Sequence, residues 1–160
     1  MKPAAFDYVR PASVAEACAL LTRRDDARLI AGGQTLIPMM AMRLARPTLL
    51  VDIARLPELL GVADKGDAIV IGAATRQAVA ERSALVAQKL PLLAKALPFV
   101  GHAPTRSRVT LGGSVANADP AAEIPRVLAT LKGTIELASD GSAQTFTSNG
   151  FFQEIGRAHV

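Results

Sequence analysis

The sequence has few of the residues that build disulfides, metal sites and membrane spans. It contains one cysteine, Cys18, and two histidines, His102 and His159, and neither histidine has a cysteine or a second histidine nearby. An intrachain disulfide is therefore impossible, and no metal-ligand cluster is expected. No apolar run reaches the length of about 18 residues that a membrane-spanning helix needs. Because the first residues also lack a signal-peptide pattern, we expect a cytoplasmic protein.

Aromatic residues and strong charge are scarce as well. Aromatics make up 4% of the 160 residues, with no tryptophan, so alanine, leucine and valine must supply most of the core. Half of the residues are hydrophobic and 20% are charged, which favours one folded domain or two small subdomains over disorder. The net charge of +4 is spread without a basic stripe or interleaved aromatics. Nucleic-acid binding is therefore not expected.

Two glycine pairs organise the rest of the chain. Gly32-Gly33 and Gly112-Gly113 each follow an apolar or β-branched run and precede small polar residues and a predicted helix. Glycine allows a backbone turn with φ > 0 and a close approach of a ligand. Unpaired N–H groups at such a turn suit an anion such as pyrophosphate. One glycine pair after a strand is most often only a turn, but two pairs with similar surroundings favour a ligand site.

The first 55 residues follow a β-α-β-α-β pattern. Strands are predicted at residues 6–9, at residues 28–31, which we expect to be buried, and at residues 48–53. A capping box of Ser13 and Glu16 starts one helix, and Thr35 starts a second helix that Pro47 closes. This spacing predicts parallel strands with right-handed crossovers and a ligand at their carboxyl ends, where the first glycine pair falls. The G-x-G-x-x-G fingerprint is absent, which disfavours an ordinary NAD site.

The remaining residues predict a mixed α/β region. We expect a connector at 55–66, a strand at 68–72, a helix capped by Thr75, and a helix at 84–97 capped by Ser83 and broken at Pro91. A further helix is predicted from residue 121 to about 131, with Asp119 as N-cap and Pro120 as first residue. Asp140 and Gly141 predict a hairpin turn between strands 133–138 and 143–147.

Three smaller expectations concern single residues and the end of the chain. We expect Cys18 to be buried and His102 to be a loop residue without an ionic role. Phe151 and Phe152 have no obvious partner in the sequence. Residues 154–160 look foreign to the rest, so we expect that the natural protein continues past about Gln153 and assign no function to this stretch.

Both glycine motifs resemble those of a known family. Residues 31–38 (AGGQTLIP) resemble the first flavin-binding loop of the molybdenum hydroxylase flavoproteins, the medium FAD subunits of carbon monoxide dehydrogenase and bacterial xanthine dehydrogenase. Residues 110–114 (TLGGS) with 117–123 (NADPAAE) resemble the second loop, and residues 43–47 and 50–53 also fit. The resemblance covers about residues 3–152.

The resemblance implies an α+β fold with two FAD-binding subdomains, as in vanillyl-alcohol oxidase and p-cresol methylhydroxylase. Residues 1–55 would form the small βαβαβ subdomain. Residues 56–153 would form the larger mixed α/β subdomain, which is incomplete at its C-terminus, and residues 154–160 would be a non-native tail. The family usually has glycine at the position of Val109, and a β-branched residue is unfavourable there if φ > 0 is required.

The resemblance also implies which residues bind FAD, and none of them is expected to be catalytic. The first loop would wrap the pyrophosphate through backbone amides, and the second would hold the diphosphate and ribityl region from the other side. An apolar contact beside the flavin and a hydrogen bond between the cofactor and an acidic residue would strengthen the binding. The set comprises Leu29, Ile30, Ala31, Gly32, Gly33, Gln34, Thr35 and Leu36 from the first loop, Val100 beside the flavin, Thr110, Gly112, Gly113 and Ser114 from the second loop, Asn117, Asp119, and Glu123 as the acidic residue.

The function implied by the resemblance is electron transfer. Substrate would be oxidised on a large molybdopterin-containing partner subunit. Electrons would pass through a small 2Fe-2S subunit to FAD on this oxidoreductase subunit, and then to an acceptor such as NAD or a quinone. Two alternatives remain: a non-catalytic nucleotide-binding or assembly module, and a self-contained flavin oxidase of the same fold.

Overall fold

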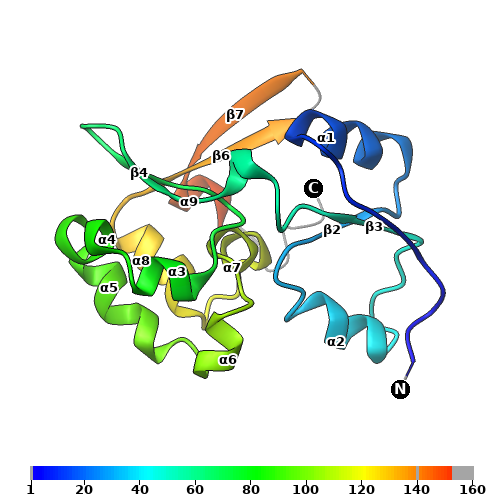
Figure 1. The fold of residues 1–160 in the computed structure, drawn as a ribbon, viewed down its shortest axis with the longest axis horizontal. Helices are drawn as coiled ribbons and strands as arrows, with labels where there is room; N and C mark the ends of the chain where they lie inside the picture. The colour runs from blue at the N-terminus through cyan, green and yellow to red at the C-terminus, as the bar shows by residue number, and fades with distance from the viewer. Residues whose placement is uncertain (1, 140, 153–160) are drawn as a thin grey trace.

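The computed structural model describes residues 2–139 and 141–152 of the chain (Figure 1). Three parallel strands at the N-terminal side form a sheet in the order β1-β3-β2, with bounds β1 (Asp7–Val9), β2 (Arg28–Ile30) and β3 (Leu49–Asp52). The helices α1 (Val14–Arg23) and α2 (Leu36–Ala41) connect these strands on opposite sides of the sheet. The predicted β-α-β-α-β order and the parallel pairing are confirmed.

The sheet buries its central strand and leaves β2 at an edge. Leu49 and Val51 pack with Ala17 of α1, while Leu50 points to the opposite face by the alternation of a strand and is also buried. Leu29 in β2 is 43% exposed. The prediction of a buried second strand was therefore wrong, because within the described residues β2 pairs only with β3.

The helix ends of this region agree with the sequence at α1 and differ at α2. The Ser13 hydroxyl oxygen accepts a hydrogen bond from the Glu16 amide at 3.1 Å, as the capping box predicts. Thr35 stands at the N-cap of α2 without a side-chain cap bond. That helix ends at Ala41, not at Pro47, because Arg43 adopts a left-handed conformation with φ 61°. The amides that follow then turn back to the last carbonyls of the helix.

The middle of the chain is mainly helical and contains one strand that the sequence did not predict. A short hairpin pairs β4 (Val62–Asp64) with β5 (Ile69–Ile71), where the sequence suggested a connector before the strand. The elements after η1 (Pro57–Leu59) and this hairpin are α3 (Gln77–Glu81), α4 (Ala84–Lys89), α5 (Pro91–Ala96), η2 (Leu97–Phe99), α6 (Ala103–Arg106), α7 (Leu111–Asn117) and α8 (Glu123–Thr130). The break at Pro91 and the Ser83 cap of α4 are confirmed.

The last described elements form a hairpin and a short helix. The strands β6 (Thr134–Ser139) and β7 (Ser142–Thr147) pair antiparallel as predicted, and α9 (Ser148–Phe151) follows. Asp140 of the predicted turn and the stretch 154–160 lie outside the described residues. Phe151 is buried and meets Phe146 and Phe152 edge to face, so the expectation of aromatics without a partner was wrong.

The hairpin joins the two sides of the molecule. It extends from the helical side across to α1 (Figure 1), where the Cys18 sulfur lies 3.6 Å from the Ala138 carbonyl oxygen. Cys18 is half-buried, less than the sequence suggested. Among residues 2–139 and 141–152, buried apolar residues form two separate clusters, one between α1 and the parallel sheet and one among the helices. Within the described residues, no helix is long and apolar enough to cross a membrane.

Candidate functional site

The first glycine pair lies in the loop that leaves the carboxyl end of β2. Gly33 has φ +68°, a conformation that glycine adopts without strain. Within the described part of the chain, the backbone amides of Gly32, Gly33, Gln34, Thr35 and Leu36 donate to no backbone or side-chain acceptor. This loop therefore presents several unpaired N–H groups in succession, which is the arrangement that an anion requires.

The second glycine pair lies inside the first turn of α7. The sequence had suggested a position before the helix. Thr110 is the N-cap, and its hydroxyl oxygen accepts from the Gly113 amide at 3.1 Å. Neither glycine of this pair has a positive φ, and neither does Val109. The expected φ > 0 turn was wrong here, so the β-branched Val109 causes no backbone conflict.

The amides of the second pair already have partners within the protein. Leu111 donates to the Thr75 carbonyl and Gly112 to the Ala73 carbonyl, both at 2.9 Å. A Cβ atom on Gly112 would stand 2.5 Å from the Ala73 Cβ and 2.6 Å from its Cα. Gly112 is therefore required for close packing of two backbone segments, and a bound diphosphate would have to share its amide.

The segment that packs against the second pair was missed in the sequence. Residues 73–77 run along residues 109–112, with Arg76 bridged to Thr110 and the Gln77 amide donating to the Val109 carbonyl at 2.9 Å. The available signal was Gly112, because its close contact with Ala73 leaves no room for a Cβ atom. Sequence alone does not distinguish such a close approach from an ordinary turn.

The two glycine pairs are brought together by the fold. A Cβ atom on Gly32 would stand 2.5 Å from the Arg108 carbonyl oxygen and 2.9 Å from the Val109 Cα. The first loop therefore rests directly on the backbone that leads into the second glycine pair. Two motifs about 80 positions apart in the sequence form one continuous surface of backbone.

Five further predicted site residues lie on either side of the second pair, between positions 100 and 123. Val100 is half-buried against the helical core, and the Ser114 hydroxyl accepts from the Gln77 side-chain amide at 2.9 Å. Asn117 ends α7, and half-buried Glu123 begins α8. Asp119 was predicted as the N-cap of that helix, but the N-cap is Ala122. The Asp119 carboxylate accepts from the Ala121 amide at 2.8 Å and closes a turn before α8 starts.

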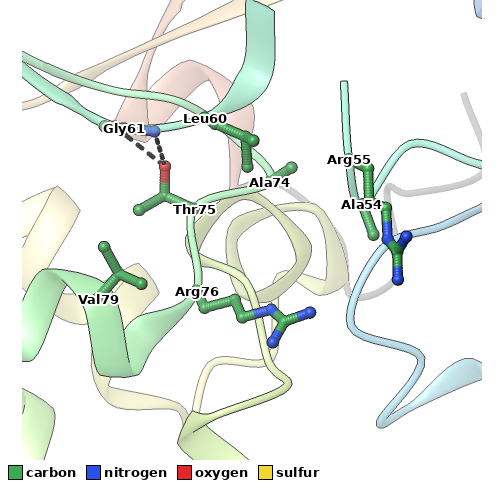
Figure 2. A pocket seen from close by; sticks show the side chains of 8 residues that line it. All are labelled: Ala54, Arg55, Leu60, Gly61, Ala74, Thr75, Arg76 and Val79. Atoms are coloured by element: carbon green, nitrogen blue, oxygen red, sulfur yellow. Dashed lines mark hydrogen bonds between the residues drawn. The ribbon is translucent and has the colours of Figure 1, made fainter. Parts of the chain in front are cut away.

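A shallow hollow of about 460 Å³ lies beside the segment that supports the second pair (Figure 2). Thr75 lies in its wall, with a hydroxyl that hydrogen-bonds both the amide and the carbonyl of Gly61. The prediction that Thr75 caps α3 was therefore wrong, because its side chain is engaged elsewhere and the N-cap is Arg76. The lining residues are Ala54, Arg55, Leu60, Gly61, Ala74, Thr75, Arg76 and Val79, none of which was a predicted site residue.

One ion pair lies among the supports of the site. Arg106 meets Glu81 at 2.9 Å behind the loop that carries Val100. Hydrogen bonding from Arg106 lowers the pKa of Glu81. His102 is exposed at the start of α6. The described residues contain no group of three or more His, Cys, Asp or Glu suited to a metal ion.

Comparison with known proteins gives consistent relatives. The family described as the FAD binding domain in molybdopterin dehydrogenase matches residues 4–160. The chain is 46% identical to the 6-hydroxypseudooxynicotine dehydrogenase complex subunit alpha of Paenarthrobacter nicotinovorans, over 87% of this chain and 47% of that protein.

Solved structures agree with the sequence comparison. A carbon monoxide dehydrogenase chain from Hydrogenophaga pseudoflava superposes with a TM-score of 0.95 at 39% identity, over 98% of this chain and 55% of that one. A chain of quinoline 2-oxidoreductase from Pseudomonas putida 86 superposes with the same TM-score at 38% identity and the same coverage. The chain thus spans about half the length of the relatives it matches. It belongs to the family of FAD-binding domains of molybdopterin dehydrogenases.

Proposed function

We propose that this chain binds FAD through the surface that the two glycine pairs form, as the FAD-binding part of an electron-transfer subunit. The observation that carries the proposal is the contact of Gly32 with the Arg108–Val109 backbone, beside five amides without an acceptor among the described residues. An extended dinucleotide needs such donors at its pyrophosphate and a backbone without side chains close by. The residues of the site therefore fit FAD.

The proposed division of labour follows from which groups remain available. The amides of residues 32–36 would bind the pyrophosphate. Ser114, oriented by Gln77, would contribute a hydroxyl from the second side, and Val100 would make the apolar contact with the flavin. The set that the resemblance implies is completed by Leu29, Ile30, Ala31, Thr110, Gly112, Gly113, Asn117, Asp119 and Glu123. FAD, when bound, would accept and pass on electrons, and the protein would supply binding and orientation.

We further propose the two-subdomain arrangement of the vanillyl-alcohol oxidase type, with residues 1–55 and 56–153 as its parts. Two observations support it. The apolar core consists of two separate clusters, and the first glycine loop meets the second where these two parts adjoin. A cytoplasmic location stays a prediction.

The proposed context is a molybdenum hydroxylase complex. A large molybdopterin subunit would oxidise the substrate, and a small 2Fe-2S subunit would deliver the electrons to FAD for transfer to NAD or a quinone. Relatives named as a dehydrogenase complex subunit and as a carbon monoxide dehydrogenase medium chain support this context. No acid–base pair was recognised in the sequence, which is consistent with a subunit that transfers electrons.

The first experiment is an absorbance spectrum of the purified chain from about 300 to 550 nm, with FAD added if the protein is colourless. We expect flavin bands that stay with the protein through gel filtration. If flavin is retained only by a longer chain that extends to the natural stop codon, the remaining sequence is needed for binding. Absence of flavin from both chains would refute the proposal and leave the nucleotide-binding module.

A second measurement separates electron transfer from oxidase activity. A flavin oxidase would reduce its flavin with a small organic substrate and release hydrogen peroxide in air. If the chain belongs to an electron-transfer subunit, we expect no peroxide from such substrates. The bound flavin should instead be reduced by dithionite and reoxidised by a quinone. Peroxide formation at catalytic rates would favour the oxidase alternative.

A further inference from the structure

Arg106 makes four hydrogen bonds behind the proposed cofactor site. It is the last residue of α6, and its side chain is 11% exposed. Two of its nitrogens donate to the two carboxylate oxygens of Glu81, at 2.9 and 3.2 Å. A third donates to the carbonyls of Val100 and Gly101, at 3.3 and 3.0 Å. Such a two-pronged arginine–carboxylate contact fixes orientation as well as distance.

The helix that carries Arg106 also supports the first glycine loop. In the turn after α6, the amides of Arg108 and Val109 both donate to the Thr105 carbonyl at 2.9 Å. Gly32 rests on this turn, because a Cβ there would meet the Arg108 carbonyl at 2.5 Å. The position of α6 therefore sets the position of the backbone that the first loop contacts.

The partner helix α3 closes the arrangement at its other end. Glu81 at its C-terminal end holds Arg106, while Gln77 at its N-terminal end donates through its backbone to Val109 and through its side chain to Ser114. Residues 100–114 are thus tied to α3 at both ends. A change at the Arg106 end should reach both glycine pairs without any direct contact with the cofactor.

We propose that Arg106, held by Glu81, is a positioning residue that fixes the Val100–Gly101 turn and the Arg108–Val109 seat of the first glycine loop in the geometry that FAD binding needs. This inference rests on the proposed function. Arg106 acts through the backbone and not on the flavin itself. Loss of the Arg106 side chain should make the distance between the two glycine pairs more variable, and this effect should exceed any loss of stability in the helical core.

The test compares Arg106→Met and Arg106→Lys with the control Val86→Ala. Val86 is fully buried in α4 and belongs to the helical core, so its truncation lowers stability without touching α6. We expect Arg106→Met to raise the Kd for FAD about tenfold and to change the visible circular dichroism of the bound flavin. Arg106→Lys should recover part of the affinity, and Val86→Ala should stay within about twofold of the wild-type Kd.

Hydrogen exchange supplies a readout that needs no flavin. In the chain without FAD, Arg106→Met should speed exchange of the Val109 and Gln77 amides relative to that of Val51 in the central strand of the sheet. Val86→Ala should not change this ratio. If wild-type protein binds no FAD, the proposed function fails and exchange alone decides the positioning role. Unchanged exchange of the Val109 amide in Arg106→Met would overturn the inference. An equal loss of FAD affinity in Arg106→Met and Val86→Ala at matched stability would also overturn it.

Discussion

The two glycine pairs look alike in the sequence and differ in the structure. Gly32-Gly33 lies in an open loop with a positive φ at Gly33 and with amides that find no acceptor in the part of the chain that the structure describes, whereas Gly112-Gly113 lies in a helix with its amides engaged. The first pair leaves donors available for a ligand. The second lets Ala73 approach the backbone at Gly112, and this close contact packs the segment that contains Ala73 against the start of α7. The same dipeptide therefore leaves amide donors available in one place and has its amides engaged within the protein in the other.

The largest expected effect is on stability, from Gly112→Ala. The added methyl group would stand 2.5 to 2.7 Å from atoms of Ala73, two of them backbone atoms, which cannot rotate away. We expect a loss of about 3 kcal/mol in the free energy of unfolding, measured by urea denaturation. A loss below about 0.5 kcal/mol would show that the second pair is not a packing device.

Gly32→Ala should have the next largest effect and should act on FAD more than on folding. Its methyl group would meet the Arg108 carbonyl oxygen and push the first loop away from the second. Because the amides of residues 32–36 have no acceptor among the described residues that would hold the loop in place, we expect a loss of about 1 to 2 kcal/mol in stability. The Kd for FAD should rise at least about tenfold, as measured by flavin fluorescence titration. An unchanged Kd would separate the glycine contact from binding.

Gly33→Ala tests the backbone conformation, with Gly66→Ala as its matched control. Both glycines have a positive φ, +68° and +84°, so each alanine should cost about 1 kcal/mol of stability. A Cβ atom added at Gly66 would meet no atom within 4 Å, and Gly66 lies in the exposed β4–β5 turn, away from the glycine pairs. We expect only Gly33→Ala to weaken FAD binding. Equal effects of the two variants on the Kd would argue against the first loop as the pyrophosphate site.

The smallest effect is a pH dependence of the Glu81–Arg106 pair that supports both glycine pairs. Hydrogen bonding from Arg106 lowers the pKa of Glu81 below its ordinary value of 4.5. The pair therefore contributes its full stability above about that pH, and this contribution is lost as the pH falls through the lowered folded-state pKa. In Glu81→Gln, the difference in unfolding free energy from wild type should shrink between neutral pH and acid. A constant difference across that range would contradict this linkage.

Much of the N-terminal region could be predicted because its signals are local. Strand and helix order follow from apolar periodicity, and the Ser13 cap depends on residues three positions apart. The family could be identified from the two glycine motifs and their order. Failures came where a side chain found its partner in another segment of the chain. Thr75 bonds to Gly61 and not to its own helix, and Phe151 packs on Phe146.

By itself the sequence determined the β-α-β-α-β start, the break at Pro91, the C-terminal hairpin and the two glycine motifs of a flavin-binding family. Only the tertiary structure decided what each glycine does. The contact of Gly32 with Arg108 and of Gly112 with Ala73 joins residues far apart in the chain, and no local pattern records such a distance. For the same reason the four bonds of Arg106 became visible only when α3, α6 and the loop of Val100 were packed together.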